Sequence, residues 1–232
     1  PIEYSGSYGT NGFYLSFATS GLLAATGGTV TTDGDYKVHT FTSNGTFTPD
    51  ISGEVDYLVI AGGGGGGNGN GGGGAGGGGG AGGYKTGTSS VTAQAYSITV
   101  GAGGTAGASG GSAPTVSVNS IFSSFTSTDG GKGASYNSSS YVAGGNGGSG
   151  GGVAGGGYTD TVAGGSATSG QGFDGGNHIT SSPYNGGGGG GAGAVGATNG
   201  NGGAGLASSI TGSSVTPSGP VSYIHLTLPT TP

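Results

Sequence analysis

A glycine tract follows directly on a strand-like apolar run at residues 57–83, where the sequence reads YLVIAGGGGGGNGNGGGGAGGGGGAGG. Glycine loses more conformational freedom on folding than any other residue. Such a tract can be a disordered tether, a loop that cradles phosphate, or a folded element in which backbones must touch. The choice among these three alternatives decides what this chain can fold into.

The spacing of the other residues in the glycine tracts separates these alternatives. Within residues 71–83 the only side chains are Ala75 and Ala81, which are two three-residue repeats apart. Other tracts repeat every third residue in the series Ala102, Thr105, Ala108; Ala143, Asn146, Ser149; and Ala192, Val195, Thr198, Asn201, Ala204. A left-handed helix of the polyproline type has three residues per turn and no internal hydrogen bonds, so its backbone groups must pair with neighbouring chains.

This register predicts packed polyglycine II helices in residues 62–83, 101–112, 143–157 and 186–205. A single helix over residues 62–83 would be roughly 65–70 Å long, so we expect the tract to turn at Asn68–Asn70. Collagen also has a three-residue repeat, but it requires strict Gly-X-Y and abundant proline, and this chain has 8 prolines.

The stretches between the tracts have strand-like patterns and no helical period. Residues 36–49 form two β-like runs around Asn44-Gly45, which is a hairpin signal. Residues 54–61 are apolar on both faces, which is typical of a buried strand, and Tyr96, Ile98 and Val100 alternate. The sequence therefore predicts an all-β fold, with a β-sandwich or jelly-roll-like scaffold into which a polyglycine II helix bundle is inserted.

Composition and motifs argue against several functions. The three lysines are dispersed and there is no arginine, which does not fit nucleic-acid binding. No apolar run is long enough for membrane insertion. The phosphate-loop pattern fails because neither Lys85 nor Lys132 stands between a glycine and a Ser or Thr.

The three histidines also lack the neighbouring residues that acid–base catalysis would need. His39, His178 and His225 have no carboxylate or nucleophile at a catalytic spacing, and we expect them to be surface or hairpin residues. We therefore expect a non-enzymatic protein with no catalytic, metal or cofactor-binding residues.

Aromatic residues gather in the connectors between the later tracts. These candidate receptor-binding residues are Tyr136, Tyr141, Tyr158, Phe173, His178 and Tyr184. Aromatic side chains give large, rigid contacts and suit the recognition of a receptor or a sugar. The alternative is that they seal the ends of the helix bundle.

The series HTFTSNGTFTPDISGEVDYLVIAGGGGGG, GGGAGGYKTG, SSVTAQAYSITVGAGG and GGAGLASSITGSSVT resembles the glycine-rich domain of bacteriophage tail-fibre and adhesin-like proteins. The resemblance covers roughly residues 35–216. It implies a virion or extracellular location, a host surface receptor or glycan as partner, and other tail-fibre subunits, with a homotrimer as one arrangement. The family has no uniform catalytic residues, so it assigns no role to single positions.

The ends of the chain carry separate expectations. Residues 1–26 are interpreted as the remnant of a preceding domain or a linker, and residues 27–220 as the glycine-rich domain. The final VSYIHLTLPTTP resembles a translated sequencing adapter, which predicts that residues 221–232 are not native. Because the chain begins at Pro1 and contains no methionine, we expect a fragment of a longer protein.

Other functions remain open at this point. The main alternative is a secreted or cell-surface bacterial matrix protein, which would have different genomic neighbours from a phage fibre. Below it rank an ice-binding protein, which needs a regular Thr or Ala ladder, and a fibre-borne polysaccharide hydrolase, which needs paired carboxylates.

Overall fold

The computed structural model describes residues 23–69, 74–108, 113–136, 143–156, 162–178, 185–198, 200–212, 214, 216 and 223–229. Within these residues the regular structure consists of strands and includes no helix, so none of them forms a helix that could span a membrane. The strands are β1 (Ala25–Thr26), β2 (Thr29–Asp33), β3 (Tyr36–Phe41), β4 (Gly45–Pro49), β5 (Gly53–Ile60), β6 (Tyr84–Val91), β7 (Tyr96–Thr99), β8 (Ser120–Phe122), β9 (Phe125–Ser127) and β10 (Tyr223–Pro229).

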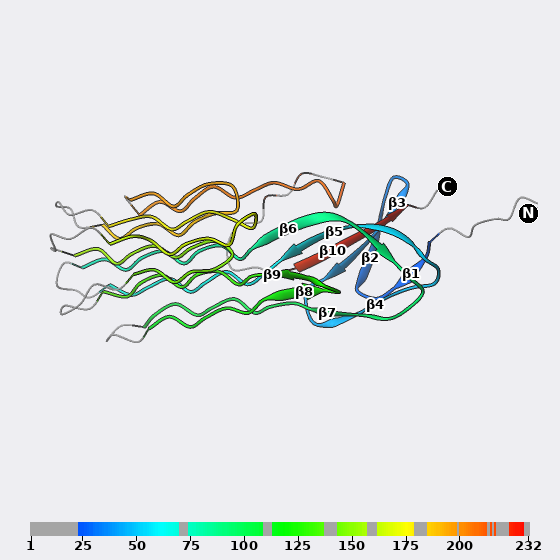
Figure 1. Ribbon diagram of the computed structural model, residues 1–232, viewed down its shortest axis with the longest axis horizontal. Helices are drawn as coiled ribbons and strands as arrows, with labels where there is room; N and C mark the ends of the chain where they lie inside the picture. Colours follow the sequence, from blue (N-terminus) through cyan, green and yellow to red (C-terminus); the bar gives the residue numbers. More distant parts are fainter. Residues whose placement is uncertain are drawn as a thin grey trace, which may run out of the picture.

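The strands form two five-stranded sheets, which confirms the all-β prediction. One sheet has the order β1-β4-β7-β8-β9 and the other β2-β3-β10-β5-β6, and neighbouring strands are antiparallel. The sheets lie at one end of an elongated molecule, and the glycine-rich segments extend from them toward the other end (Figure 1).

The main hydrophobic core lies between the two sheets. Phe47 and Phe122 come from the first sheet, and Val59 and Leu226 from the second; all four are fully buried in the same cluster. The rings of Phe47 and Phe122 meet edge to face with centroids 6.2 Å apart. Burial of such side chains from both sheets is what holds a β-sandwich together.

Strand β5 is buried on both faces, as its sequence predicts. Val55, Tyr57 and Val59 belong to the core between the sheets. Leu58 and Ile60 face the other way and form a second cluster with Tyr84, against which Ala192 and Ile210 pack. Residues of the glycine-rich part therefore pack on the outer face of this sheet.

The predicted hairpin at Asn44-Gly45 is wrong. Strands β3 and β4, on either side of it, belong to different sheets, so the chain crosses the sandwich at this point. Phe41 and Phe47 enter the same core from the two sheets. The Asn44 side chain holds the corner by accepting a hydrogen bond from the Val100 backbone N–H at 2.8 Å.

Strand β10 occupies the middle of its sheet. It pairs with β3 on one side and β5 on the other, and Ile224, Leu226 and Leu228 are buried. The C-terminal segment thus completes the sandwich, whereas its non-native origin stays a prediction. At the other end of the chain, Leu23 and Ala25 of the predicted 1–26 segment pack against the core.

Candidate functional site

The glycine-rich segments leave the sandwich at one end and run back and forth side by side (Figure 1). Residues 61–69 continue from β5, and residues 74–83 return to β6. The backbone N–H groups of Gly64 and Gly67 donate to the carbonyls of Gly80 and Gly77 at 2.9 and 2.8 Å, which makes the two segments antiparallel. The tract therefore folds back between Gly67 and Gly77, as its length requires.

Hydrogen bonds between neighbouring segments repeat every third residue. The amides of Gly77 and Gly80 donate to the carbonyls of Ala134 and Gly131, at 2.8 Å in both cases. The amides of the next register, Ala75, Gly78 and Ala81, donate instead to Gly155, Gly187 and Gly190. Each segment thus pairs with several neighbours at once, and a long glycine-rich backbone obtains partners without forming a sheet.

Close backbone contact explains why the segments are glycine. A Cβ atom built on Gly76 or Gly79 would meet the carbonyl oxygen of Gly67 or Gly64 closer than 3.0 Å, and one on Gly77 would meet that of Gly152. Real Cβ atoms essentially never approach an oxygen so closely. By contrast, Ala102, Thr105 and Ala108 are exposed, in the register where the sequence places side chains.

Two of the predicted tracts reverse direction where the sequence suggested one continuous face. Gly145 and Gly148 donate to Lys132 and Asp129, whereas Gly131 donates to Ser149, so the chain reverses just before Ser149. Ser149 is fully buried and its Oγ donates to Gly191. The three-residue spacing of Ala143, Asn146 and Ser149 therefore does not continue along a single segment. Residues 185–206 similarly divide into three segments, because Gly188 donates to Ala197 and Gly203 donates to Gly189.

Most described segments of the bundle run toward the end farthest from the sheets, here called the tip (Figure 1). Tyr136 lies at the tip, where its N–H donates to the Asn68 carbonyl at 2.7 Å and its ring lies beside Gly74. His178 also lies there, and its N–H donates to the Val162 carbonyl at 3.3 Å.

The structure separates the predicted aromatic residues. Phe173 is 42% exposed but lies toward the sheets, since its N–H donates to Gly191 and the nearby Gln171 carbonyl accepts from Tyr84 of β6. It cannot share one contact surface with Tyr136. The other predicted residues, Tyr141, Tyr158 and Tyr184, lie outside the described residues, and their role stays a prediction.

Neither His39 nor His178 lies at the surface, contrary to the expectation for a surface residue. His39 is 1% exposed on β3, and its Nδ1 lies 2.8 Å from the Gly27 carbonyl. His178 is 5% exposed, and its Nε2 lies 2.8 Å from the Gly156 carbonyl. The His178 Nδ1 is buried and has no hydrogen-bond partner among the residues that the structure describes. His178 therefore packs within the tip and presents little surface to a receptor.

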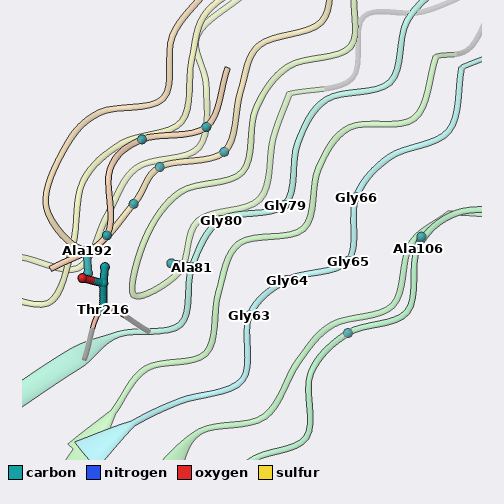
Figure 2. A pocket seen from close by; sticks show the side chains of 17 residues that line it. Gly63, Gly64, Gly65, Gly66, Gly79, Gly80, Ala81, Ala106, Ala192 and Thr216 are labelled. Carbon is teal, nitrogen blue, oxygen red and sulfur yellow. The ribbon is translucent and has the colours of Figure 1, made fainter. Parts of the chain in front are cut away.

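A groove lies along the side of the bundle and was not predicted from the sequence. It has a volume of about 550 Å³ and is lined by residues of the segments 61–69, 74–83, 101–108, 185–192 and 201–206, together with Thr216. Figure 2 shows Gly63 to Gly66 running through it, with Gly79 to Ala81 on one side and Ala106 on the other. All lining residues are Gly, Ala or Thr, so the groove carries no charge.

Comparison with known protein families supports one assignment. The profile of a family described as a glycine-rich domain matches residues 41–223. The chain belongs to this glycine-rich domain family. Comparisons with curated proteins and with solved structures gave no match.

The match of the glycine-rich domain includes strands β4 to β9, the bundle segments and the first residue of β10. This confirms the family resemblance at the level of the domain. Strands of both sheets and the bundle belong to one family match, so the glycine segments are part of the domain and not a linker beside it.

The described part of the glycine-rich domain offers little for chemistry. No three His, Asp or Glu side chains gather there as metal ligands. Two of the acidic side chains hold the backbone: Asp50 accepts from Ala24 N–H and Asp174 from Ala167 N–H, at 2.9 and 2.7 Å. Asp56 instead accepts from the Thr88 hydroxyl at 2.7 Å. The structure therefore directs attention to the surfaces of the bundle, namely its tip and its side groove.

Proposed function

We propose that this glycine-rich domain is a non-catalytic binding module of a phage tail fibre or adhesin, which holds its chain reversals out toward a host surface receptor or glycan. The observation that carries the proposal is the common direction of the segments. Most described segments of the bundle run from the sandwich toward the same far end (Figure 1). Binding proteins commonly carry their contact residues at one end of a rigid scaffold.

The residues near the reversals support a binding role. Tyr136 lies at the tip, and the sequence places Tyr141, Tyr158 and Tyr184 between segments that meet there. Tyrosine provides contact area with few torsions to immobilise. The buried His178 then acts as packing beneath the contact surface.

We further propose that the bundle segments are polyglycine II helices. The three-residue repeat of the hydrogen bonds and the close approach of neighbouring backbones support this helix type. A helix of about 3.1 Å rise per residue projects the tip farther than an α-helix of the same length would. The helix type predicts φ near −75° and ψ near +145° at Gly77, Gly78 and Gly79.

A cell-surface matrix protein remains the second candidate. The acidic net charge of −6 and the nearly uncharged bundle would suit a structural layer as well as a fibre. A matrix role requires no receptor at the tip, and this difference makes the two functions separable.

The decisive experiment measures binding of the purified chain to a panel of bacterial cells and to a glycan array. The fibre proposal expects saturable binding to particular cells or glycans. Alanine substitution of Tyr141, Tyr158 or Tyr184 should weaken it about tenfold or more. Phe173→Ala is the matched control, because Phe173 is exposed away from the tip. If no cell or glycan binds, or if Phe173→Ala weakens binding as much as the tip variants, tip recognition is refuted.

A further inference from the structure

Among the bundle glycines whose surroundings the structure describes, two lack the close contact that explains the others. At most described glycines an added Cβ would meet another backbone or a side chain, and at Gly34, Gly170 and Gly200 a positive φ requires glycine. At Gly66 the nearest atoms to an added Cβ are 4.0 Å away, and at Gly202 the nearest is 3.8 Å away. Neither has a positive φ. Within the glycine surroundings that the structure describes, these two positions have ordinary room for a side chain.

Both glycines line the groove on the side of the bundle. Gly66 belongs to the segment that runs through the groove in Figure 2. Gly202 belongs to the 201–206 segment, which also lines the groove. In the rest of the bundle, glycine in this register marks a place where a second backbone comes into contact. Two unexplained glycines in one groove therefore indicate a backbone contact that a single chain does not make.

The polar groups of the groove point to the same kind of partner. Within the described part of the chain, the backbone N–H groups of Gly63, Gly66 and Gly79 donate no hydrogen bond, although neighbouring amides such as that of Gly64 do. An extended backbone laid along the groove could supply carbonyl acceptors at a three-residue spacing, as the segments supply them to one another.

We propose that the groove receives the 201–206 segment of a second copy of the chain, in a two-fold symmetric dimer. A two-fold contact is self-complementary, so one surface must supply both the receiving groove and the inserted segment. The groove surface does so, because the 201–206 segment lines the groove and is largely exposed. In this dimer Gly202 of each copy meets Gly66 of the other, and one contact accounts for both glycines.

Charge favours a second copy along this face. The chain carries a net charge of −6, so two copies repel each other wherever acidic groups meet. The groove lining contains only Gly, Ala and Thr, and residues 201–206 read NGGAGL without a charged side chain. This contact therefore brings no like charges together.

Sedimentation velocity of the full chain over a wide concentration range tests the proposal. We expect a monomer–dimer equilibrium that Gly202→Leu weakens at least about tenfold. Gly202 is exposed and a Cβ there meets nothing closer than 3.8 Å in the monomer, whereas a leucine side chain blocks the contact with a second copy. Ala102→Leu is the matched control, since Ala102 is exposed outside the groove, and it should leave the equilibrium unchanged. A chain that stays monomeric at all concentrations, or a dimer that Gly202→Leu does not weaken, overturns the proposal.

A measurement on the unmodified chain covers the case in which Gly202→Leu fails to fold. Amide exchange at Gly66 and Gly79, followed by NMR, should slow as concentration rises, while exchange at Gly170 in an exposed turn should not change. Exchange that is independent of concentration at all three residues contradicts the dimer. If the chain is monomeric but a synthetic glycine-rich peptide protects Gly66, the groove takes a different partner and the second copy is wrong.

Discussion

Glycine positions in the bundle are of two kinds: those where an added Cβ would collide with a neighbouring backbone, and those where it would not. Gly79 contacts the Gly64 carbonyl so closely that a Cβ cannot fit, whereas Gly66 has room for one. The two residues lie in adjacent antiparallel segments and differ in little else. This pair therefore isolates backbone contact as the cause of the glycine requirement.

We expect Gly79→Ala to lower the free energy of unfolding by about 1–3 kcal/mol, because the neighbouring backbone must move to admit the methyl group. Gly66→Ala should be neutral or stabilising by up to about 1 kcal/mol, since it restricts the unfolded chain. Urea unfolding of the two variants at low protein concentration makes the comparison. Equal losses at both sites would show that backbone contact is not what requires glycine.

His225 gives the sandwich a dependence on pH. Burial lowers the pKa of His225, and its Nδ1 lies 2.9 Å from the Thr40 hydroxyl of the neighbouring strand. The unfolded chain, with a histidine pKa of about 6.5, takes up a proton before the folded one does. The stabilisation from neutral His225 is therefore present above about pH 6.5 and is lost as the pH falls toward the lowered pKa.

Stability measured by urea unfolding should accordingly decline between neutral pH and mildly acidic pH. His225→Gln removes the titrating group and should flatten this part of the profile, whatever its effect at neutral pH. A decline that is as steep in His225→Gln as in the parent chain would assign the pH dependence to other groups.

At the level of single residues, prediction from the sequence succeeded where a local pattern of side chains determines burial. Residues 55–60 carry apolar side chains on both faces of the strand, and the apolar side chains of both faces are buried. The burial of His178 could not be predicted, because Gly156, which contacts it, lies far away in the sequence and belongs to another segment. The open glycines Gly66 and Gly202 are also invisible in a run of glycines, since only the packed bundle distinguishes them.

Among the elements, the turn at residues 168–171 fastens the bundle to the sandwich. The Gln171 carbonyl accepts from the N–H of Tyr84, the first residue of β6, at 2.9 Å. Its side-chain Oε1 accepts from the N–H of Thr128, just after β9, at 2.7 Å. One residue thus joins a bundle turn to strands of both sheets.

Gln171→Ala should destabilise the chain by about 1–3 kcal/mol, because it leaves the partly buried Thr128 amide without its acceptor. Gln171→Glu keeps an acceptor oxygen and should cost less. Thermal unfolding followed by circular dichroism provides the comparison. The fastening role would be excluded if both variants unfolded at the temperature of the parent chain.

Element-level prediction was limited by reversals that leave no trace in composition. Three-residue spacing continues from Ala143 to Ser149, yet the chain reverses before Ser149. The Ser149 hydroxyl there donates a hydrogen bond to the Gly191 carbonyl of another segment. The crossing at Asn44-Gly45 carries the same sequence signal as a hairpin, and the shared core of Phe41 and Phe47 decides between them. In both places a contact distant in sequence determines the direction of the chain.

At the scale of the whole molecule, a β-sandwich carries a long bundle that has almost no hydrophobic core of its own. Its segments are held by backbone hydrogen bonds to several neighbours, and its glycines allow the close approach that these bonds require. The account therefore depends on the bundle being ordered in solution. The tip and groove proposals both require this order.

Residue-resolved amide exchange of the full chain at low concentration tests this central claim most directly. The amides of Gly64, Gly67, Gly77 and Gly80, which donate to neighbouring segments, should exchange slowly, and those of Gly63, Gly66 and Gly79 should exchange fast. The account predicts this alternation along both segments. Exchange of all seven amides at the rate of an unfolded chain would show that the tracts are disordered and would contradict it.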